Sequence, residues 1–206
     1  MKKKIAVLVL IGVMVFSFTA CRDSNDGYSK SSSAANEGDS SKISGETYDT
    51  GKFKVLIPDG WMALKMNDTS GETDEDGNYP VDKFSVGIIK GGSSEWDAFS
   101  KPTIYIWVQD DNEMASYAES VVKWYNESKK IDVAVEGKET VAYETKMSYG
   151  SSEDDEVYIY NLVFIQLDND HIAQVSVPAD MGDDIGGVSV TDADVKAIIE
   201  SVEMDY

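Results

Sequence analysis

Residues 157–177 read VYIYNLVFIQLDNDHIAQVSV, and this stretch predicts the fold of the domain. Residues 157–167 and 172–177 are two runs of β-branched, aromatic and other apolar residues, which are typical of strands. Between them lies Asp168-Asn169-Asp170, which favours a tight turn. The sequence therefore predicts an antiparallel hairpin at this point of the chain.

Similar patterns occur on both sides of this hairpin. Further strands are predicted at residues 53–57, 61–66, 84–89, 103–108, 131–135 and 140–147. From residue 113 to 129, apolar residues recur at spacings of three and four, which predicts an amphipathic helix. Thr191 is predicted to cap a second, short helix. This order predicts an α+β domain, in which an antiparallel β-sheet packs against helices.

Two segments resemble a known family. The strand from Phe53 leading into Pro58-Asp59-Gly60-Trp61 resembles the start of PsbP-like domains, and the helix that ends Ile198-Ile199-Glu200-Ser201-Val202 is similar to theirs. That fold is shared by the photosystem II extrinsic protein PsbP, the Ran-binding Mog proteins and many bacterial lipoproteins. The resemblance covers most of residues 53–206 in the order of elements. It implies a PsbP-like α/β/α sandwich with a binding or assembly role and no catalytic residues.

Residues 1–20 have the pattern of a bacterial signal peptide. Three lysines, at positions 2–4, precede an uncharged stretch over residues 5–20, which is short for a ~30 Å hydrocarbon core. Phe18-Thr19-Ala20-Cys21 then resembles the lipobox of bacterial lipoproteins, with Phe18 in place of the preferred leucine. The resemblance implies cleavage before Cys21, a diacylglycerol thioether on this cysteine, and anchoring to the extracytoplasmic face of a cell membrane.

The cysteine count favours this interpretation over an ordinary secretory signal with a coincidental cysteine. Cys21 is the only cysteine of the chain, so it has no disulfide partner. A two-chain lipid anchor is stable, whereas one acyl chain binds a membrane only marginally. Residues 21–46 are predicted to be the lipidated cysteine and a disordered tether, with a reach of roughly 28 Å. Residues 47–206 are predicted to form one domain.

The charge balance limits the function classes. The chain has 38 acidic and 18 basic residues, and its formal net charge is −20. This excludes a general nucleic-acid role, because such a role needs a basic surface to neutralise phosphates. It also argues against adhesion of the domain to anionic lipid. The acidic balance is compatible with cationic partners, with divalent ions, or with plain solubility.

One acidic segment has features of a calcium loop. Glu72, Asp74 and Asp76 supply alternate oxygen donors, and Gly77 suits the sharp turn of such a loop. Lys83 stands where a bidentate glutamate would close the site. Calcium, or another divalent ion, is the only cofactor that the sequence suggests. The alternative is that this segment is a solvated acidic turn.

Two aromatic residues lie in an unexpected place. Trp96 and Phe99 occur in the polar insertion at residues 91–101, whereas Trp61, Trp107 and Trp124 fall in predicted elements and are predicted to be core. The pair is expected either to form a partner-binding patch, because aromatic anchors dominate interfaces, or to fold back over a sheet edge.

An enzymatic function has little support in the sequence. His171 is the only histidine, and it is predicted to be a solvated turn residue. The chain contains no G-x-S-x-G pattern. With 38 acidic residues, close carboxylate pairs arise by chance, so a carboxylate-based hydrolase is only a third alternative. The sequence predicts a non-enzymatic, membrane-anchored domain that binds a protein or a small ligand, with a divalent-ion-responsive domain as the main rival.

Overall fold

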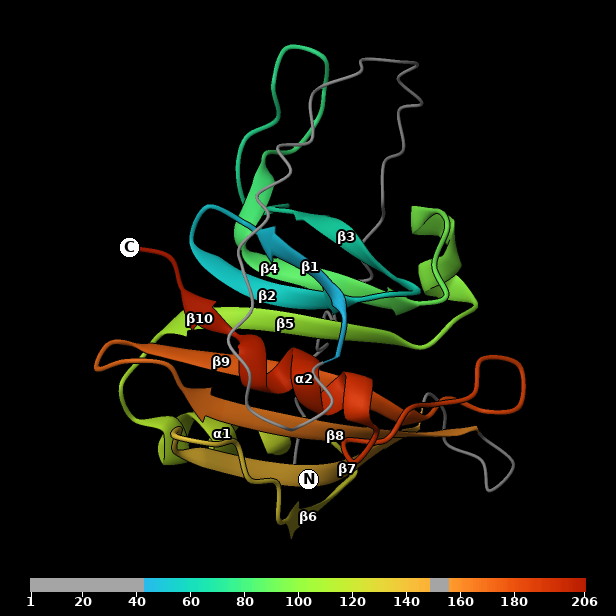
Figure 1. The fold of residues 1–206 in the computed structure, drawn as a ribbon, viewed down its shortest axis with the longest axis vertical. Helices are drawn as coiled ribbons and strands as arrows, with labels where there is room; N and C mark the ends of the chain where they lie inside the picture. Colours follow the sequence, from blue (N-terminus) through green and yellow to red (C-terminus); the bar gives the residue numbers. More distant parts are fainter. Residues whose placement is uncertain (1–42, 149–155) are drawn as a thin grey trace, which may run out of the picture. The chain divides into compact units, whose positions relative to one another are not determined.

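The computed structural model describes residues 43–148 and 156–206 (Figure 1). The described residues fall into two units: residues 67–80 belong to one, and residues 43–66 with 81–206 belong to the other. Cys21 and the predicted signal peptide lie outside the described residues. In the part of the chain that is described, no helix has both the length and the apolarity needed to cross a membrane.

The larger unit is built on an antiparallel sheet. Within the described residues its seven strands have the order β3-β4-β5-β9-β8-β7-β6. Their bounds are β3 Trp61–Asn67, β4 Val81–Lys90, β5 Thr103–Asp110, β6 Glu127–Ile131, β7 Thr140–Ser148, β8 Val157–Gln166 and β9 His171–Asp180. The predicted hairpin is the β8–β9 pair, and β9 also pairs antiparallel with β5 along its other edge.

A second, smaller sheet has the strand order β1-β2-β10 in the described part of the chain. Its bounds are β1 Gly45–Asp49, β2 Phe53–Pro58 and β10 Glu203–Met204. Gly45 and Glu46, which were predicted to belong to the tether, are strand residues. They pair with Pro58 and Ile57 across the β1–β2 hairpin, and this pairing outweighs their polar, glycine-containing local sequence.

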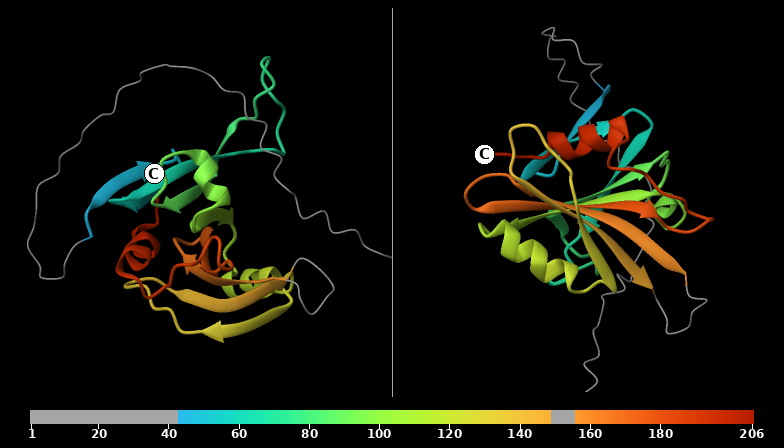
Figure 2. Two further views of the ribbon diagram at one scale, coloured as in Figure 1. Left: turned by 90° about the vertical axis from the view of Figure 1, so that its right-hand side faces the viewer. Right: turned by 90° about the horizontal axis from the view of Figure 1, so that it is seen from below.

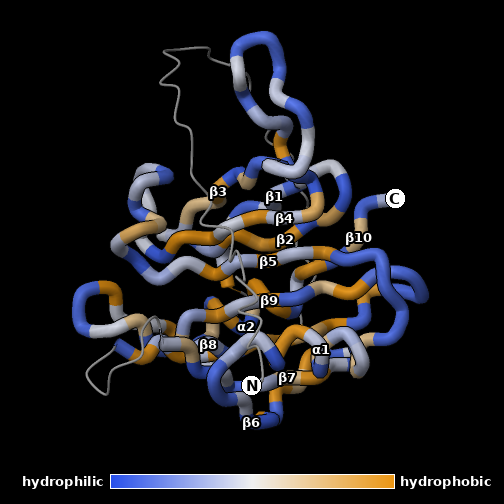
Figure 3. Tube along the Cα trace, turned by 180° about the vertical axis from the view of Figure 1, so that it is seen from behind, coloured by the Kyte–Doolittle hydropathy of each residue, from blue (hydrophilic) through white to orange (hydrophobic). Residues whose placement is uncertain are grey.

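Helices α1 (Met114–Val122) and α2 (Ala193–Ser201) pack on opposite faces of the large sheet (Figure 2). The alternation of β8 shows this directly. Val163 and Ile165 lie in the core that includes α2, whereas Leu162 and Phe164 lie in the core that includes α1. All four side chains are fully buried, and each contributes roughly 1.5–3 kcal/mol of burial free energy. In Figure 3, hydrophobic segments recur along the strands and helices, whereas most connecting loops are hydrophilic.

The predicted helix at residues 113–129 was wrong in its second half. α1 ends at Val122, and Glu127–Ile131 forms the edge strand β6, which pairs with β7. Trp124 therefore lies beyond the helix and is 67% exposed, so it is not the core residue that was predicted. Helical spacing is a local pattern, and here the pairing with β7 overrides it. Lysines in β6 also suit a sheet edge, because they discourage edge-to-edge association.

The fold class was predicted correctly at the coarse level. The described chain is mostly antiparallel β-sheet with two α-helices, which is an α+β arrangement. The polar insertion at residues 91–101 contains one turn of 3-10 helix, η1 (Glu95–Phe99), which the sequence did not predict.

Candidate functional site

Two aromatic side chains of η1, Trp96 and Phe99, are exposed on the surface. Trp96 is 56% exposed and Phe99 is 57% exposed, so neither ring folds back fully over the sheet edge. Residues three apart on a 3-10 helix project to the same side. The two ring centroids accordingly lie 6.1 Å apart, with a 34° angle between the ring planes. We call residues 91–101 the aromatic loop.

One carboxylate holds the aromatic loop together. Oδ2 of Asp97 accepts hydrogen bonds from the backbone N–H of Ser93 at 2.7 Å and of Ser94 at 3.2 Å. The Lys101 ammonium group lies 3.1 Å from the same oxygen and donates to the carbonyl of Gly91 at 2.7 Å. The first half of the loop is thus linked to its last residue through a single side chain.

These donors change the acidity of Asp97. Hydrogen bonds from the Ser93 backbone and from the Lys101 ammonium group favour the charged carboxylate and lower the pKa of Asp97 to about 2. The side chain is therefore ionised at any physiological pH, so the aromatic loop keeps its central acceptor.

Packing fixes the underside of the loop. Ala98 packs against a small core that includes Leu64 and Ile89. Gly92 lies so close to the sheet that an added Cβ would come within 2.9 Å of Ile89 Cβ and 3.0 Å of Met62 Cβ. The loop is thus anchored by its small residues, while its large rings point outward.

A second aromatic pair lies on the face of the sheet that η1 contacts. The rings of Tyr105 and Trp107 on β5 stack with centroids 5.6 Å apart, and Tyr105 packs on the same small core as Ala98. Burial raises the pKa of the Tyr105 hydroxyl. Trp107 is half-buried and not the core residue that was predicted. Successive residues of β5 point to opposite faces of the sheet, and Ile104 and Ile106 lie on the face that belongs to the main core. This alternation could have predicted that Trp107 lies on the other face.

The acidic segment lies in a unit of its own among the described residues, residues 67–80. Glu72, Asp74 and Asp76 are all exposed. Oδ1 of Asp74 accepts hydrogen bonds from the backbone N–H of Asn78 at 2.8 Å and of Asp76 at 3.0 Å. Chiefly because of the Asn78 N–H, the pKa of Asp74 is lowered. Across residues 43–148 and 156–206, no group of three or more His, Cys, Asp or Glu side chains is placed to hold a metal ion. A calcium site here stays a prediction.

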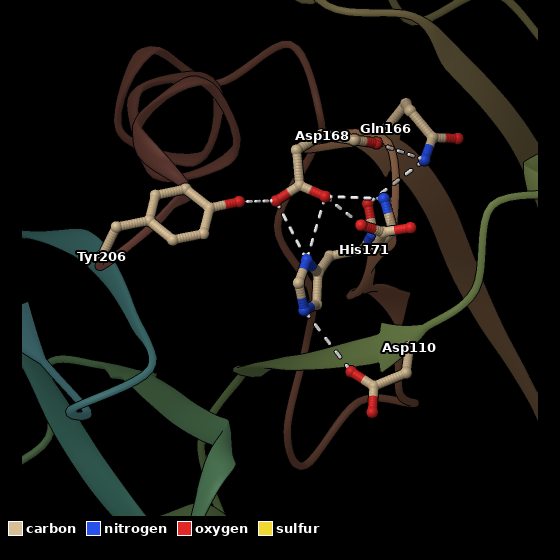
Figure 4. Close-up of polar contacts among 6 residues, drawn as sticks. Asp110, Gln166, Asp168, His171 and Tyr206 are labelled. Carbon is tan, nitrogen blue, oxygen red and sulfur yellow. Dashed lines mark hydrogen bonds and ion pairs between the residues drawn. The ribbon is translucent and has the colours of Figure 1, made fainter.

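The histidine lies in a polar cluster, drawn in Figure 4. His171 begins β9, and its side chain is 22% exposed, so it is not a solvated turn residue. Its Nδ1 lies 2.9 Å from both carboxylate oxygens of Asp168, and its Nε2 lies 3.5 Å from Oδ1 of Asp110. On the other side, the Tyr206 hydroxyl donates to Asp168 (Figure 4). Asp168 thus connects the β8–β9 turn to Tyr206 and, through His171, to the end of β5.

The hydrogen bonds of this cluster join segments of the chain and indicate a structural role. Burial acts to raise the pKa of Asp168, but hydrogen bonds from Tyr206, the Asp170 backbone and His171 outweigh it and lower the pKa to about 2. Both ring nitrogens of His171 face carboxylates, and the one hydroxyl drawn in Figure 4, that of Tyr206, points at Asp168. Among the described residues, the hydrogen-bond and ion-pair partners of the imidazole are the carboxylates of Asp168 and Asp110, whereas an acyl-transfer site places a hydroxyl or thiol nucleophile beside the imidazole.

Comparisons with known proteins add little. No protein-family model matches the chain, and neither does any curated protein. Among solved structures, a Bacteroides thetaiotaomicron protein aligns with a TM-score of 0.42 and 14% identity, over 79% of this chain and 49% of that one. This chain therefore spans about half the length of that protein. Similarity at this level carries no conclusion about function.

Proposed function

We propose that this protein is a lipid-anchored extracytoplasmic lipoprotein whose α+β domain binds a protein partner, without catalysis, through Trp96 and Phe99. The observation that carries the binding role is the exposed aromatic pair on a loop held by Asp97. Pre-ordered aromatic side chains are effective anchors, because little conformational entropy is lost when they bind.

The anchor rests on the sequence Phe18-Thr19-Ala20-Cys21. Metabolic labelling with a radioactive fatty acid in a bacterial host should label the wild-type chain but not a Cys21→Ser variant. A Cys21→Ser/Ser24→Cys variant moves the only thiol by three residues and should also stay unlabelled. Labelling of the Cys21→Ser variant would contradict the proposal that the lipid is attached to Cys21. Labelling of the Cys21→Ser/Ser24→Cys variant would contradict the proposal that the lipobox selects the lipidated cysteine.

A PsbP-like architecture is the finer part of the proposal. Its support is the packing of α1 and α2 on opposite faces of one antiparallel sheet, together with the resemblance at residues 53–61 and 198–202. That resemblance also supports a role in binding or assembly, because it brings no catalytic residues with it.

The net charge indicates the chemistry of the partner. With a formal charge of −20, the chain attracts a protein whose contact surface is basic, and the long-range field accelerates their encounter. The rings of Trp96 and Phe99 would then supply the desolvated centre of the contact. An association rate that falls as salt is added is expected for such a pair.

Site-specific photocross-linking tests this surface. A photoreactive residue at Ser100, in the aromatic loop, should trap the partner, whereas one at Lys123, beside Trp124, should not. The trapped protein is then purified, and its affinity is measured for three chains: wild type, Trp96→Ala/Phe99→Ala, and Trp124→Ala. Trp124 is 67% exposed and serves as the matched aromatic control.

The double variant should bind at least about tenfold more weakly, and the Trp124→Ala chain should bind as the wild type does. Equal affinity of all three chains would show that Trp96 and Phe99 do not contribute to the interface. Equal loss in Trp124→Ala would mean that exposed aromatic area in general, and not this loop, governs the contact.

A further inference from the structure

We propose that a pocket between the β1–β2 turn and strands β3 and β4 binds a small anion, one that carries a carboxylate or phosphate group. The pocket has a volume of about 190 Å³ and is lined by Asp49, Thr50, Lys65, Asp82, Lys83 and Ser85, with Tyr48 and Val81. A cavity of this volume suits a compact anion. The inference does not depend on the aromatic loop or on the lipid anchor.

Two lysines give the pocket its chemistry. Among the described residues, neither Lys65 nor Lys83 has a carboxylate within 4.0 Å, unlike Lys54, Lys101, Lys146 and Lys196, which are all ion-paired. Lys83 reaches across to the β1–β2 turn: a Cβ added to Gly51 would lie 3.7 Å from its Cδ and 3.9 Å from its Nζ. Two lysines that have no carboxylate within 4.0 Å among the described residues therefore line one cavity.

The carboxylates of the same pocket are engaged elsewhere. Oδ1 of Asp82 accepts the backbone N–H of Phe84 at 2.8 Å, and its Oδ2 accepts the Ser85 hydroxyl at 2.6 Å. Oδ1 of Asp49 accepts the backbone N–H of Gly51 at 2.7 Å, while its Oδ2 lies 3.9 Å from the Lys54 ammonium group. Both carboxylates thus already have hydrogen-bond partners, and among the described residues neither lies within 4.0 Å of the Lys65 or Lys83 ammonium group.

The acidity of the whole chain does not cancel this local charge. At physiological ionic strength the Debye length is about 8 Å, so acidic residues beyond that distance are largely screened. Lys65 and Lys83 both line the pocket, and an anion bound there would form charge-assisted hydrogen bonds with their ammonium groups, which are stronger than neutral ones. Asp49 and Asp82 are near enough to oppose binding, which favours a ligand that touches both lysines at once.

Isothermal titration of the full chain in detergent tests the inference, with inorganic phosphate and citrate as the two probes. Chloride is adjusted to keep the ionic strength constant. The variant is Lys65→Gln/Lys83→Gln. The matched control is Lys129→Gln/Lys130→Gln, which removes the same charge from exposed lysines outside the pocket. Thermal unfolding of each chain verifies that it is folded.

The expected result is saturable binding of at least one probe by the wild type and the control, and binding at least tenfold weaker in the Lys65→Gln/Lys83→Gln chain. A preference between phosphate and citrate then identifies the anionic group that the pocket takes. The inference is overturned if the wild type shows no saturable binding of either probe. It is also overturned if the two double variants bind alike, because total charge would then explain the result.

Discussion

The Lys101 ammonium group lies 3.1 Å from Oδ2 of Asp97, and this contact links the end of the aromatic loop to the turn that carries Trp96 and Phe99. The same carboxylate oxygen accepts the backbone N–H groups of Ser93 and Ser94. The rigidity of the proposed binding surface therefore depends on one residue that need not touch the partner.

Replacing Asp97 with Asn should loosen the aromatic loop without removing either ring. The amide keeps the size of the side chain but weakens the charge-assisted bonds to Ser93, Ser94 and Lys101. Hydrogen exchange of the Ser93 and Ser94 amides should accelerate at least about tenfold, while amides of the β8–β9 core keep their wild-type rates. Asp183→Asn, at an exposed site elsewhere, is the control. Unchanged exchange in Asp97→Asn would show that packing of Ala98 and Gly92 alone fixes the loop.

The pH dependence of this contact has a definite sign. The pKa of Asp97 is lowered from 3.8 to about 2, so the folded state favours the charged form more than the unfolded state does. Its stabilisation is fully present above the unfolded value and is lost as the pH falls from about 4 towards 2. The difference in unfolding free energy between wild type and Asp97→Asn should therefore shrink across that interval. A difference that stays constant from pH 5 to pH 2 would contradict the assignment.

Phe164→Ala should be among the most destabilising single changes. The side chain is fully buried beneath α1, with the Tyr117 ring edge-on to it at a centroid distance of 5.8 Å. Loss of its burial and the resulting cavity are expected to cost about 3–5 kcal/mol, measured by urea unfolding. Trp124→Ala, at an exposed ring, should stay within about 0.5 kcal/mol of wild type. Comparable losses for the two variants would contradict the packing described for β8.

Lys138 is expected to stabilise the C-terminal end of α2. Its ammonium group donates to the carbonyl of Glu200, in the last turn of the helix, and to that of Val202, just after it. The last carbonyls of a helix have no intrahelical partner. Lys138→Met keeps most of the side-chain volume and should lower the unfolding free energy by about 1–3 kcal/mol. Lys196→Met, on the exposed side of the same helix, should change it by less than about 0.5 kcal/mol. An equal effect of the two changes would count against the cap.

Calcium binding by residues 72–77 can be tested with a variant that keeps the hydrogen bonds of this loop. Glu72→Gln/Asp76→Asn removes two candidate ligands but leaves Asp74, whose carboxylate also bonds the loop backbone. If residues 72–77 bind calcium, a concentration of 100 times Kd should stabilise the wild type by about 2.7 kcal/mol, seen as a raised unfolding midpoint. The shift should vanish in the variant, and magnesium chloride at equal concentration controls for ionic strength. Identical midpoints with and without calcium would leave the segment as a solvated turn.

Much of the β-structure was predictable, because most strands coincide with short, strongly apolar segments of the sequence. The β8–β9 hairpin and α2 were expected within a few residues of their observed bounds. The prediction failed where a long-range pairing competes with a local pattern. The helix was predicted to continue to residue 129, but Glu127–Ile131 forms an edge strand on β7. Gly45 was predicted to belong to the tether, but it pairs with Pro58.

The candidate sites show the same division. The sequence indicated that Trp96 and Phe99 are candidate binding residues, because large rings are unusual in a polar insertion. Only the structure shows that the two rings lie side by side, because their arrangement depends on the 3-10 helix and on the hydrogen bonds to Asp97. The lysine-bordered pocket had no local signal, because Lys65 and Lys83 come from two neighbouring strands of the large sheet and the pocket also needs the β1–β2 turn, which lies elsewhere in the chain.

The sequence by itself determined the α+β class, the central hairpin and the approximate positions of most of the strands, since these follow from hydrophobic periodicity and turn residues that act over a few positions. Only the tertiary structure decided which strands became neighbours, where α1 ended, and which side chains met at the aromatic loop, the histidine cluster and the pocket. Those outcomes depend on contacts between residues far apart in the chain, whose free energy no short segment encodes.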